Sequence, residues 1–296
     1  MKYLLLGGAG FIGQNLAKIL IKTNNEVTII DSLFTSRKPD LKCEFVLGDI
    51  TKIDIEKYIK ESPIIYFLAG SVGVEKIIDR PEECLVNNID LINTLFPFFK
   101  KYKPKVIFSS TSEVYGDGPF AESNNLSIGS PENLRWSYAA SKLLTEFYFT
   151  TGNFPYIIAR FFNIVGPGQL PHFGMVLPRF IKAAKNNEDL IVHGDGSQIR
   201  SFCHIEDAIN ILLQIQDLEE QIFNVGNDEP ITIKELAEKV IQLSGSKSQI
   251  KFVDPKQIYT ENYVDINKRI PDLTKLKQTI IHTNKYSIDD IIKSLL

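Results

Sequence analysis

A tyrosine and a lysine four residues apart could carry out proton chemistry in this chain. They are Tyr138 and Lys142, in the segment SYAASK over 137–142. On a helix, residues at this spacing lie on one face. A lysine ammonium beside a tyrosine hydroxyl favours the phenolate, which can take a proton from a substrate hydroxyl while a hydride leaves. Because the chain has eleven tyrosines, however, the pair by itself could also arise by chance.

Hydroxyl side chains gather in a second segment, SSTS over 109–112, which follows an apolar run. Open α/β sheets bind their ligands just beyond the carboxyl ends of parallel strands. If the apolar run is such a strand, Thr111 lies where a substrate would bind. Serine runs also serve as caps and turns, which is the alternative interpretation.

A glycine-rich loop, GGAGFIG over 7–13, comes directly after the first apolar run. Gly7, Gly10 and Gly13 recur at every third position, and a pyrophosphate can reach the N–H groups of a following helix only where no side chain intervenes. Asp31 ends the second apolar run, 18 residues after Gly13, where a carboxylate can bind ribose hydroxyls. This carboxylate would repel a 2′-phosphate, so the sequence favours NAD over NADP. A tight turn that needs glycine for packing alone is the alternative.

These residues need parallel strands to position them, and the chain carries suitable segments. Apolar runs without polar alternation are typical of strands buried on both faces, and segments with one apolar stripe are typical of the helices between them. The runs cover 3–6, 26–30, 44–46, 64–68, 105–109 and 156–161, and the helical segments cover 14–22, 82–101 and 137–149. The pattern predicts an α/β fold with a doubly wound parallel sheet.

The rhythm changes after Gly166, where prolines and glycines crowd the segment 167–178. A second unit therefore begins about there. We expect a short strand and turn over 191–202, a helix over 205–216, and another helix within 231–244. Thr232 and Glu235 have the spacing of a capping box at the start of that last helix.

Composition excludes several classes of protein. With 44% hydrophobic residues, 23% charged residues and a net charge of −3, the chain is typical of soluble folded proteins, and it has no basic stripe of the kind that binds nucleic acid. Its apolar runs are too short to span a membrane. The three cysteines and four histidines show no metal-ligand or disulfide spacing, so we expect no metal and a cytoplasmic location. These residues are Cys43, Cys84, Cys203, His172, His193, His204 and His282.

From Met1 almost to Leu296 the chain resembles extended short-chain dehydrogenase/reductases of the NAD-dependent epimerase/dehydratase family. Besides the features above, the matching motifs are LGDI over 47–50, FLAG over 67–70, STSEVYG over 110–116, RFFNIVGP over 160–167 and FNVG over 223–226. Within the family the chain looks most like nucleotide-sugar 4-epimerases of the UDP-glucose type. The resemblance implies a Rossmann-type NAD-binding domain over 1–166, with 200–222 returning to it. It also implies a smaller C-terminal nucleotide-sugar-binding domain formed by 167–199 and 223–296.

The resemblance also implies roles for individual residues. Thr111, Tyr138 and Lys142 would form the catalytic triad, with Lys142 also reaching the nicotinamide ribose. The other residues expected to contact NAD are Phe11 and Ile12 in the glycine loop, Asp49 and Ile50 beside the adenine, and Leu68, Ala69 and Gly70 along the cofactor. The residues expected to contact the nucleotide sugar are Asn163, Val176, His193, Arg200, Arg269 and Asp272.

The residues after Thr111 distinguish the activities that occur in this family. Dehydratases of the group carry Asp-Glu there, whereas here Ser112 precedes Glu113, which argues against dehydration. Decarboxylases of the UDP-glucuronate type show the same Thr-Ser-Glu, and LRWSY over 134–138 resembles one bacterial branch of them. We expect 4-epimerisation through a 4-keto sugar formed on tightly bound NAD. The alternatives are decarboxylation assisted by Glu113, a 4-dehydrogenase that stops at the keto sugar, and a non-catalytic NAD-binding regulatory protein.

By the same resemblance we expect a homodimer that pairs through the helices at about 82–101 and 137–150. These segments carry more apolar residues than one stripe facing a sheet should need. The residues are Leu91, Leu95, Phe98, Phe99, Leu143, Leu144, Phe147 and Phe149. The alternative is that all of them pack against the sheet.

Overall fold

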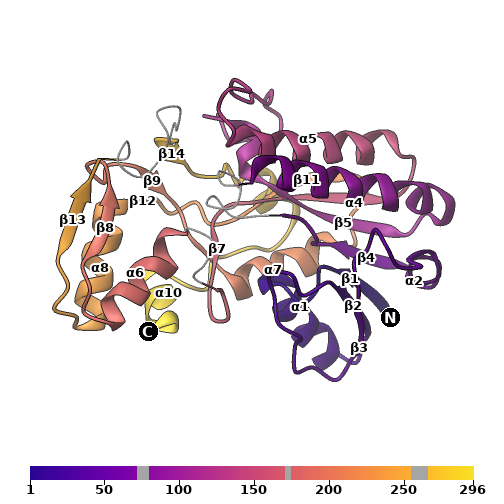
Figure 1. Ribbon diagram of the computed structural model, residues 1–296, viewed down its shortest axis with the longest axis horizontal. Coiled ribbons are helices and arrows are strands. Elements are labelled where there is room, and N and C mark those ends of the chain that lie inside the picture. Colours follow the sequence, from indigo (N-terminus) through magenta and orange to yellow (C-terminus); the bar gives the residue numbers. More distant parts are fainter. Residues whose placement is uncertain (72–79, 171–174, 255–265) are drawn as a thin grey trace.

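The computed structural model describes residues 1–71, 80–170, 175–254 and 266–296. A seven-stranded sheet with the order β11-β6-β5-β4-β1-β2-β3 dominates it, and each neighbouring pair of strands is parallel (Figure 1). The strands are β1 (Lys2–Leu6), β2 (Glu26–Asp31), β3 (Glu44–Leu47), β4 (Ile64–Phe67), β5 (Lys105–Thr111), β6 (Tyr156–Phe161) and β11 (Gln221–Val225).

Helices cover both faces of this sheet. One face packs against α1 (Phe11–Lys22) and α7 (Ile205–Ile215), and the other packs against α2 (Glu56–Glu61), α4 (Pro81–Tyr102) and α5 (Trp136–Thr151). In β1, Leu5 belongs to the first hydrophobic core and its neighbours Leu4 and Leu6 belong to the second. Because both faces are buried, the strands are apolar without alternation. The predicted doubly wound parallel sheet is confirmed.

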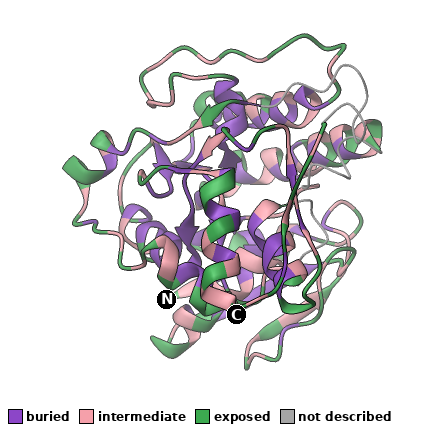
Figure 2. Cartoon of the chain, turned by 90° about the vertical axis from the view of Figure 1, so that its left-hand side faces the viewer, coloured by how far each residue is buried: buried purple, intermediate pink, exposed green. Residues whose placement is uncertain are grey.

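A smaller unit follows, with a hydrophobic core of its own. It is built from α6 (Val176–Lys185), α8 (Ile233–Ser244), α10 (Ile288–Leu295) and the parallel pair of β8 (Leu190–His193) and β13 (Ile250–Val253). Figure 2 shows how the helices expose their outer sides and bury the opposite ones. The capping box at the start of α8 is confirmed, because Thr232 Oγ1 accepts from the Glu235 N–H at 3.1 Å and Glu235 Oε2 accepts from the Thr232 N–H at 2.9 Å.

Short strands bring distant segments together between the two units. They are β7 (Ile164–Val165) with β10 (Cys203–His204), and β9 (Ile199–Arg200) with β12 (Ile231–Thr232) and β14 (Lys268–Arg269), while helix α9 (Thr274–Thr279) follows β14. In the parallel pairing of β9 with β14, Arg200 and Arg269 are register partners. The fold thus places two arginines that are far apart in the sequence side by side.

The expected division of the chain into two binding domains stays a prediction. Strand β11 belongs wholly to the large sheet, although the expected boundary at 222/223 falls within this strand. Residues 171–174, part of the expected break in the pattern and including His172, lie outside the described residues.

Within the described ranges, no helix is both long enough and apolar enough to cross a membrane.

A buried asparagine links the large sheet to the C-terminal segment. Asn224 in β11 is fully buried, and its Oδ1 accepts from the Tyr115 hydroxyl at 2.9 Å. Its Nδ2 donates to the carbonyl oxygens of Phe120 at 2.8 Å and Asp272 at 3.0 Å. The hydrogen bonds of this one buried side chain thus join β11 to the segment between β5 and α5 and to the segment before α9.

We predict that Asn224→Ala lowers the free energy of unfolding by about 2–3 kcal/mol, because it removes three hydrogen bonds made by a fully buried side chain. The matched control is Asn93→Ala, since Asn93 also accepts from a tyrosine hydroxyl, that of Tyr148 at 2.8 Å, but is exposed. Its loss should stay below about 0.5 kcal/mol. Urea unfolding measures both, and equal losses would contradict the prediction.

Candidate active site

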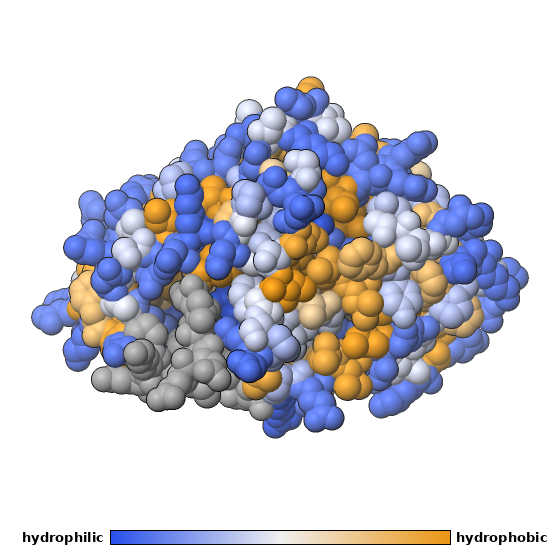
Figure 3. Space-filling model, turned by 90° about the horizontal axis from the view of Figure 1, so that it is seen from above, coloured by the Kyte–Doolittle hydropathy of each residue, from blue (hydrophilic) through white to orange (hydrophobic). Residues whose placement is uncertain are grey.

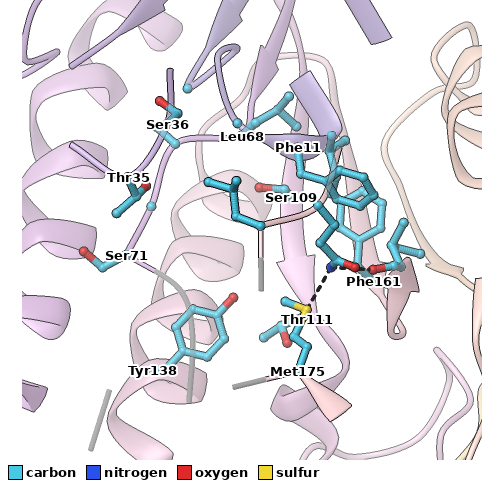
Figure 4. A pocket seen from close by; sticks show the side chains of 18 of the residues that line it. Phe11, Thr35, Ser36, Leu68, Ser71, Ser109, Thr111, Tyr138, Phe161 and Met175 are labelled. Atoms are coloured by element: carbon cyan, nitrogen blue, oxygen red, sulfur yellow. Dashed lines mark hydrogen bonds between the residues drawn. The ribbon is translucent and has the colours of Figure 1, made fainter. Parts of the chain in front are cut away.

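A large pocket opens at the carboxyl ends of the parallel strands. Its volume is about 1050 Å³, at the upper end of the range of about 300–1000 Å³ for small-molecule sites. The pocket begins at the loop after β1, where the strand order reverses between β1 and β4, and extends to β8, β9 and β14. Open α/β sheets bind ligands at such a switch point. Figure 4 shows side chains from the Rossmann-type sheet and from the segment before α6 facing this space.

The glycine loop between β1 and α1 packs too closely for side chains. Gly7 has a φ of +78°, and a Cβ there would lie 2.5 Å from the backbone nitrogen of Ala69. A Cβ at Gly13 would lie 2.5 Å from the Cα of Gly8. Gly10 precedes α1 without a capping side chain, so the first N–H groups of the helix are accessible to a pyrophosphate. Phe11 and Ile12, which follow, line the pocket.

The carboxylate of Asp31 is held in a fixed orientation at the end of β2. Its Oδ2 accepts from the Ala9 N–H of the glycine loop at 3.0 Å. Its Oδ1 accepts from the Leu33 N–H at 2.8 Å and from Ser36 Oγ at 3.0 Å. Asp31 lines the pocket while being largely buried. An oriented carboxylate beside a phosphate-binding loop fits the adenosine ribose of NAD.

The remaining residues expected at the cofactor also line this pocket: Asp49, Ile50, Leu68, Ala69 and Gly70. Asp49 Oδ1 accepts from both the N–H and the hydroxyl of Thr51, at 3.0 and 2.8 Å, which fixes the turn after β3. A Cβ at Gly70 would come within 3.1 Å of Lys142 Nζ. Gly70 therefore leaves the space that the lysine side chain occupies.

Lys142 reaches from α5 to the end of β5. Its Nζ donates to the carbonyl oxygen of Ser109 at 2.9 Å, and its side chain is almost completely buried. Burial lowers the pKa of Lys142 to about 8, although the carboxylate of Glu146, one helical turn further along α5, acts in the opposite direction. The lysine can therefore lose its proton in the weakly alkaline range.

Tyr138 lies one turn before Lys142 and faces the pocket beside Thr111 (Figure 4). Burial raises the pKa of Tyr138 above its ordinary value, and the carboxylate of Glu113 raises it further, while a hydrogen bond with Thr111 and the charge of Arg269 lower it. The sequence predicted the opposite direction, because it took account of the lysine but not of burial or Glu113. Since the ammonium of Lys142 is directed to the Ser109 carbonyl, burial decides the direction in this structure.

Two arginines converge on the carboxylate of Glu113. Its Oε1 accepts from Arg269 Nη1 at 3.0 Å and from Arg135 Nη2 at 3.3 Å, and both Glu113 and Arg135 are buried. Burial acts to raise the pKa of Glu113, but the two guanidinium groups outweigh it and hold this pKa below its ordinary value. This part of the pocket therefore stabilises a carboxylate even though it is shielded from water.

The sequence reasoning did not select Arg135 as a site residue. Arg135 directly precedes α5 and stands three residues before Tyr138. That spacing places it on the face of the helix that carries Tyr138, and this was the signal that could have found it.

Five of the six residues expected at the nucleotide sugar line the far part of the pocket: Asn163, Val176, His193, Arg200 and Arg269. Arg200 is buried and its Nη1 donates to the carbonyls of Ile199 at 3.0 Å and Asn267 at 3.4 Å. The Nδ2 of Asn163 donates to the Ser201 carbonyl at 2.8 Å and its Oδ1 accepts from Arg269 Nη2 at 2.9 Å. Asn163 thus orients Arg269.

The structure does not bring Asp272 to this pocket. Its side chain is exposed, and its Oδ1 accepts from the Thr274 N–H at 2.8 Å, at the start of α9. The expected contact with the substrate was implied by the family resemblance, in which Arg269 and Asp272 match one motif. The carboxylate turns instead to the unpaired N–H groups of the short helix that follows, a common role for an aspartate at a helix start.

Proteins of known activity are similar to this chain over almost its whole length. A UDP-N-acetyl-alpha-D-glucosaminuronate decarboxylase of Bacillus cytotoxicus (strain DSM 22905 / CIP 110041 / 391-98 / NVH 391-98) is 35% identical over 290 residues, covering 93% of this chain and 90% of the relative. UDP-glucuronic acid decarboxylase 5 of Arabidopsis thaliana is 31% identical over 296 residues, covering 95% and 84%.

A solved structure is also similar over the whole chain. UDP-glucuronic acid 4-epimerase from Bacillus cereus, in complex with UDP-glucuronic acid and NAD, superposes with a TM-score of 0.86 at 26% identity, covering 99% of this chain and 97% of that one. Residues 3–226 match the family described as "NAD dependent epimerase/dehydratase family". The chain therefore belongs to this family, and NAD is its cofactor.

Proposed function

We propose that this protein is a nucleotide-sugar decarboxylase that uses NAD and acts on a UDP-linked sugar with a carboxylate at carbon 6. The family and the similar proteins support an NAD-dependent nucleotide-sugar enzyme. Decarboxylation in particular is proposed because two guanidinium groups meet at Glu113, beside Thr111 and Tyr138. It reverses the order of the two activities expected from the sequence, where epimerisation came first.

The electrostatics of this cluster favour an acidic substrate. A buried carboxylate normally resists ionisation, yet the arginines keep the pKa of Glu113 low. A second carboxylate, brought by the sugar, would be stabilised by the same guanidinium groups, which bind carboxylates through paired hydrogen bonds. A neutral hexose would gain nothing from this arrangement. Two relatives of similar sequence are named as decarboxylases of uronic acid sugars, which supports the same choice.

The first step is oxidation at carbon 4 of the sugar. Bound NAD would supply the hydride acceptor, and its positively charged nicotinamide ring would favour the Tyr138 phenolate that the protein alone disfavours. Tyr138 takes the proton of the carbon 4 hydroxyl, and Thr111 donates a hydrogen bond to the same oxygen. Lys142, held by the Ser109 carbonyl, contributes its positive charge while it remains protonated.

The second step follows from the position of the new ketone. A ketone at carbon 4 is β to the carboxylate at carbon 6, so the bond between carbons 5 and 6 can break with its electron pair passing to the carbon 4 oxygen. Thr111 and the protonated Tyr138 donate to that oxygen and stabilise the resulting enolate. Carbon dioxide leaves and carbon 5 takes up a proton from solvent. Reduction of the carbon 4 ketone, with Tyr138 returning its proton to the oxygen, gives a UDP-pentose with no net oxidation.

Epimerisation at carbon 4 is the second candidate. The solved Bacillus cereus enzyme named as a UDP-glucuronic acid 4-epimerase holds an acidic sugar together with NAD in the same fold. Such an enzyme would use Tyr138, Thr111 and Lys142 in the same way, but it would retain the carboxylate and return the hydride to the other face of the ketone. The two candidates therefore differ in whether carbon dioxide is released.

We predict that the purified protein converts UDP-glucuronate or UDP-N-acetylglucosaminuronate to the corresponding UDP-pentose with one carbon dioxide released per turnover. Mass spectrometry and proton NMR identify the product, and Tyr138→Phe is the inactive control because it lacks the proton acceptor. A carbon 4 epimer that keeps its carboxylate would replace the proposal with the second candidate. A keto sugar that accumulates one-for-one with NADH would identify a 4-dehydrogenase.

We predict that Arg135→Met lowers kcat/KM for the uronic acid substrate about 100-fold, because removing one partner of a buried charge pair costs about 2–5 kcal/mol. Binding of UDP itself, measured by calorimetry, should change less than about twofold. The matched control is Arg80→Met, since Arg80 also faces a carboxylate, that of Glu83 at 3.4 Å, but is exposed. Loss of UDP affinity in parallel with kcat/KM would argue against a role for Arg135 at the carboxylate.

A homodimer through α4 and α5 is also proposed here. Of the apolar residues that the sequence suggested for this interface, Leu95, Phe99 and Phe149 are fully buried in the core and pack against the sheet. Leu144 and Phe147, by contrast, are 40% and 60% exposed on α5. Figure 3 looks onto this side of the molecule and shows apolar patches among the hydrophilic side chains. A second copy of the chain would cover them.

We predict that the protein sediments as a dimer at micromolar concentration and that Phe147→Glu shifts it to a 33.5 kDa monomer, because a charge in an apolar interface loses its hydration. Phe252→Glu is the control, since Phe252 is 51% exposed but lies on β13 in the smaller unit. A wild-type protein that sediments only as a monomer would refute the proposed dimer.

A further inference from the structure

A second buried carboxylate lies behind the reacting residues, on the same helix. Glu146 follows Lys142 by one turn of α5 and is almost completely buried. Its Oε1 accepts from Ser110 Oγ and from Arg160 Nε at 3.0 Å, and its Oε2 accepts from Arg160 Nη2 at 2.6 Å. Ser110 lines the pocket, whereas neither Glu146 nor Arg160 is among the residues that line it.

These bonds connect α5 to two strands of the large sheet. Ser110 belongs to β5 and Arg160 to β6, and the two are register partners in the pairing of these strands. Ser110 directly precedes Thr111, and the carbonyl of Ser109 accepts from Lys142 Nζ. Three consecutive residues of β5 thus have linked roles. Ser109 accepts a hydrogen bond from Lys142, Ser110 donates one to Glu146, and Thr111 lines the pocket. A change at Glu146 would therefore alter the surroundings of both Lys142 and Thr111.

The charged, titratable and polar groups near Lys142 and Tyr138 come from several elements. On its own helix they are Tyr138 and Glu146, while β5 offers the Ser109 carbonyl and the ring of Phe108, 4.8 Å from Nζ. From α4, Cys84 faces Tyr138, as does Glu113 from the 3-10 helix after β5. Arg160 on β6 acts on Lys142 through its ion pair with Glu146. Glu146 is the negative charge that opposes the effect of burial on the lysine.

We propose that Glu146 is a positioning residue for hydride transfer, whose carboxylate lies one helical turn from Lys142 and fixes Thr111 through its hydrogen bond with Ser110. The proposal rests on the oxidation step that decarboxylation and epimerisation share, so it does not depend on which of them the protein performs. The competing explanation is that Glu146 and Arg160 form a buried ion pair that serves the stability of the fold alone.

Three variants separate these explanations. Glu146→Gln keeps an acceptor for Ser110 but removes the negative charge and leaves the Arg160 guanidinium buried without its ion-pair partner, so it can fail to fold. The double variant Glu146→Gln with Arg160→Met removes both charges and restores neutrality. Arg160→Met alone keeps Glu146 but leaves its carboxylate buried without the ion-pair partner, so this variant can also fail to fold. Circular dichroism and thermal unfolding confirm which of the variants are folded.

The measurement is the alkaline pKa of kcat/KM with a UDP-sugar substrate, together with the pKa of Lys142 itself. Competitive labelling with acetic anhydride, read by mass spectrometry of the peptide that contains Lys142, gives the second value without any substrate. In the wild type, activity should fall as the pH rises through about 8, because Lys142 loses its proton there. The double variant should lower both values by about 1, and Arg160→Met should raise them.

The sign of the two changes decides the outcome. Opposite shifts in the double variant and in Arg160→Met support the proposal, because only the charge at position 146 distinguishes them in this way. Unchanged pKa values in folded variants, or shifts in the same direction, would overturn it in favour of a purely structural ion pair. If no UDP-sugar is turned over, the function proposed above fails, while the labelling of Lys142 still decides the role of Glu146.

Discussion

The structure depends on the burial of one parallel sheet on both of its faces. Such a sheet requires helical crossovers, and these send every strand in the same direction, so all the carboxyl ends meet along one edge. The glycine loop follows β1, and Asp31 and Thr111 are the last residues of β2 and β5, so all three line one pocket for this reason. The crossover helices cover the faces of the sheet but not this edge, and residues of the smaller unit line the other side of the pocket. The position of the site thus follows from the burial of both faces of the sheet.

Charges shielded from water decide what this pocket can do. Glu113 remains ionised because two guanidinium groups outweigh the effect of burial, whereas Tyr138 resists ionisation because burial acts on it together with the charge of Glu113. The protein therefore holds an anion-stabilising position beside a tyrosine that needs further positive charge before it can take a proton. In the proposed mechanism, the nicotinamide ring of bound NAD would supply that charge.

Behind the pocket, polar contacts connect the elements that carry the reacting groups. Glu146 and Arg160 join α5 to β5 and β6, and the ring of Tyr115 lies 4.7 Å from the guanidinium of Arg160. Tyr115 in turn donates to Asn224, which holds the carbonyl of Asp272, three residues after Arg269. The helix with Tyr138 and the segment with Arg269 are therefore connected through the protein interior as well as across the pocket. A precise geometry at the sugar requires such support, because small displacements of reacting groups cost large factors in rate.

Features that depend on neighbours in the chain were determined by the sequence. The strand, glycine loop, helix and acidic residue of the cofactor site occur within the first 31 residues, and the capping box of α8 spans four positions, so local spacing was enough to predict both. The relation of Tyr138 to Lys142 followed from the period of one helix. Local spacing could not predict the contact between Glu113 and Arg269. These residues are 156 positions apart and become neighbours only when β14 pairs with β9. The direction of the Tyr138 pKa and the turning of Asp272 to α9 were likewise decided by tertiary structure. Both depend on burial and on which hydrogen-bond partner lies nearest in space, and neither is a property of sequence separation.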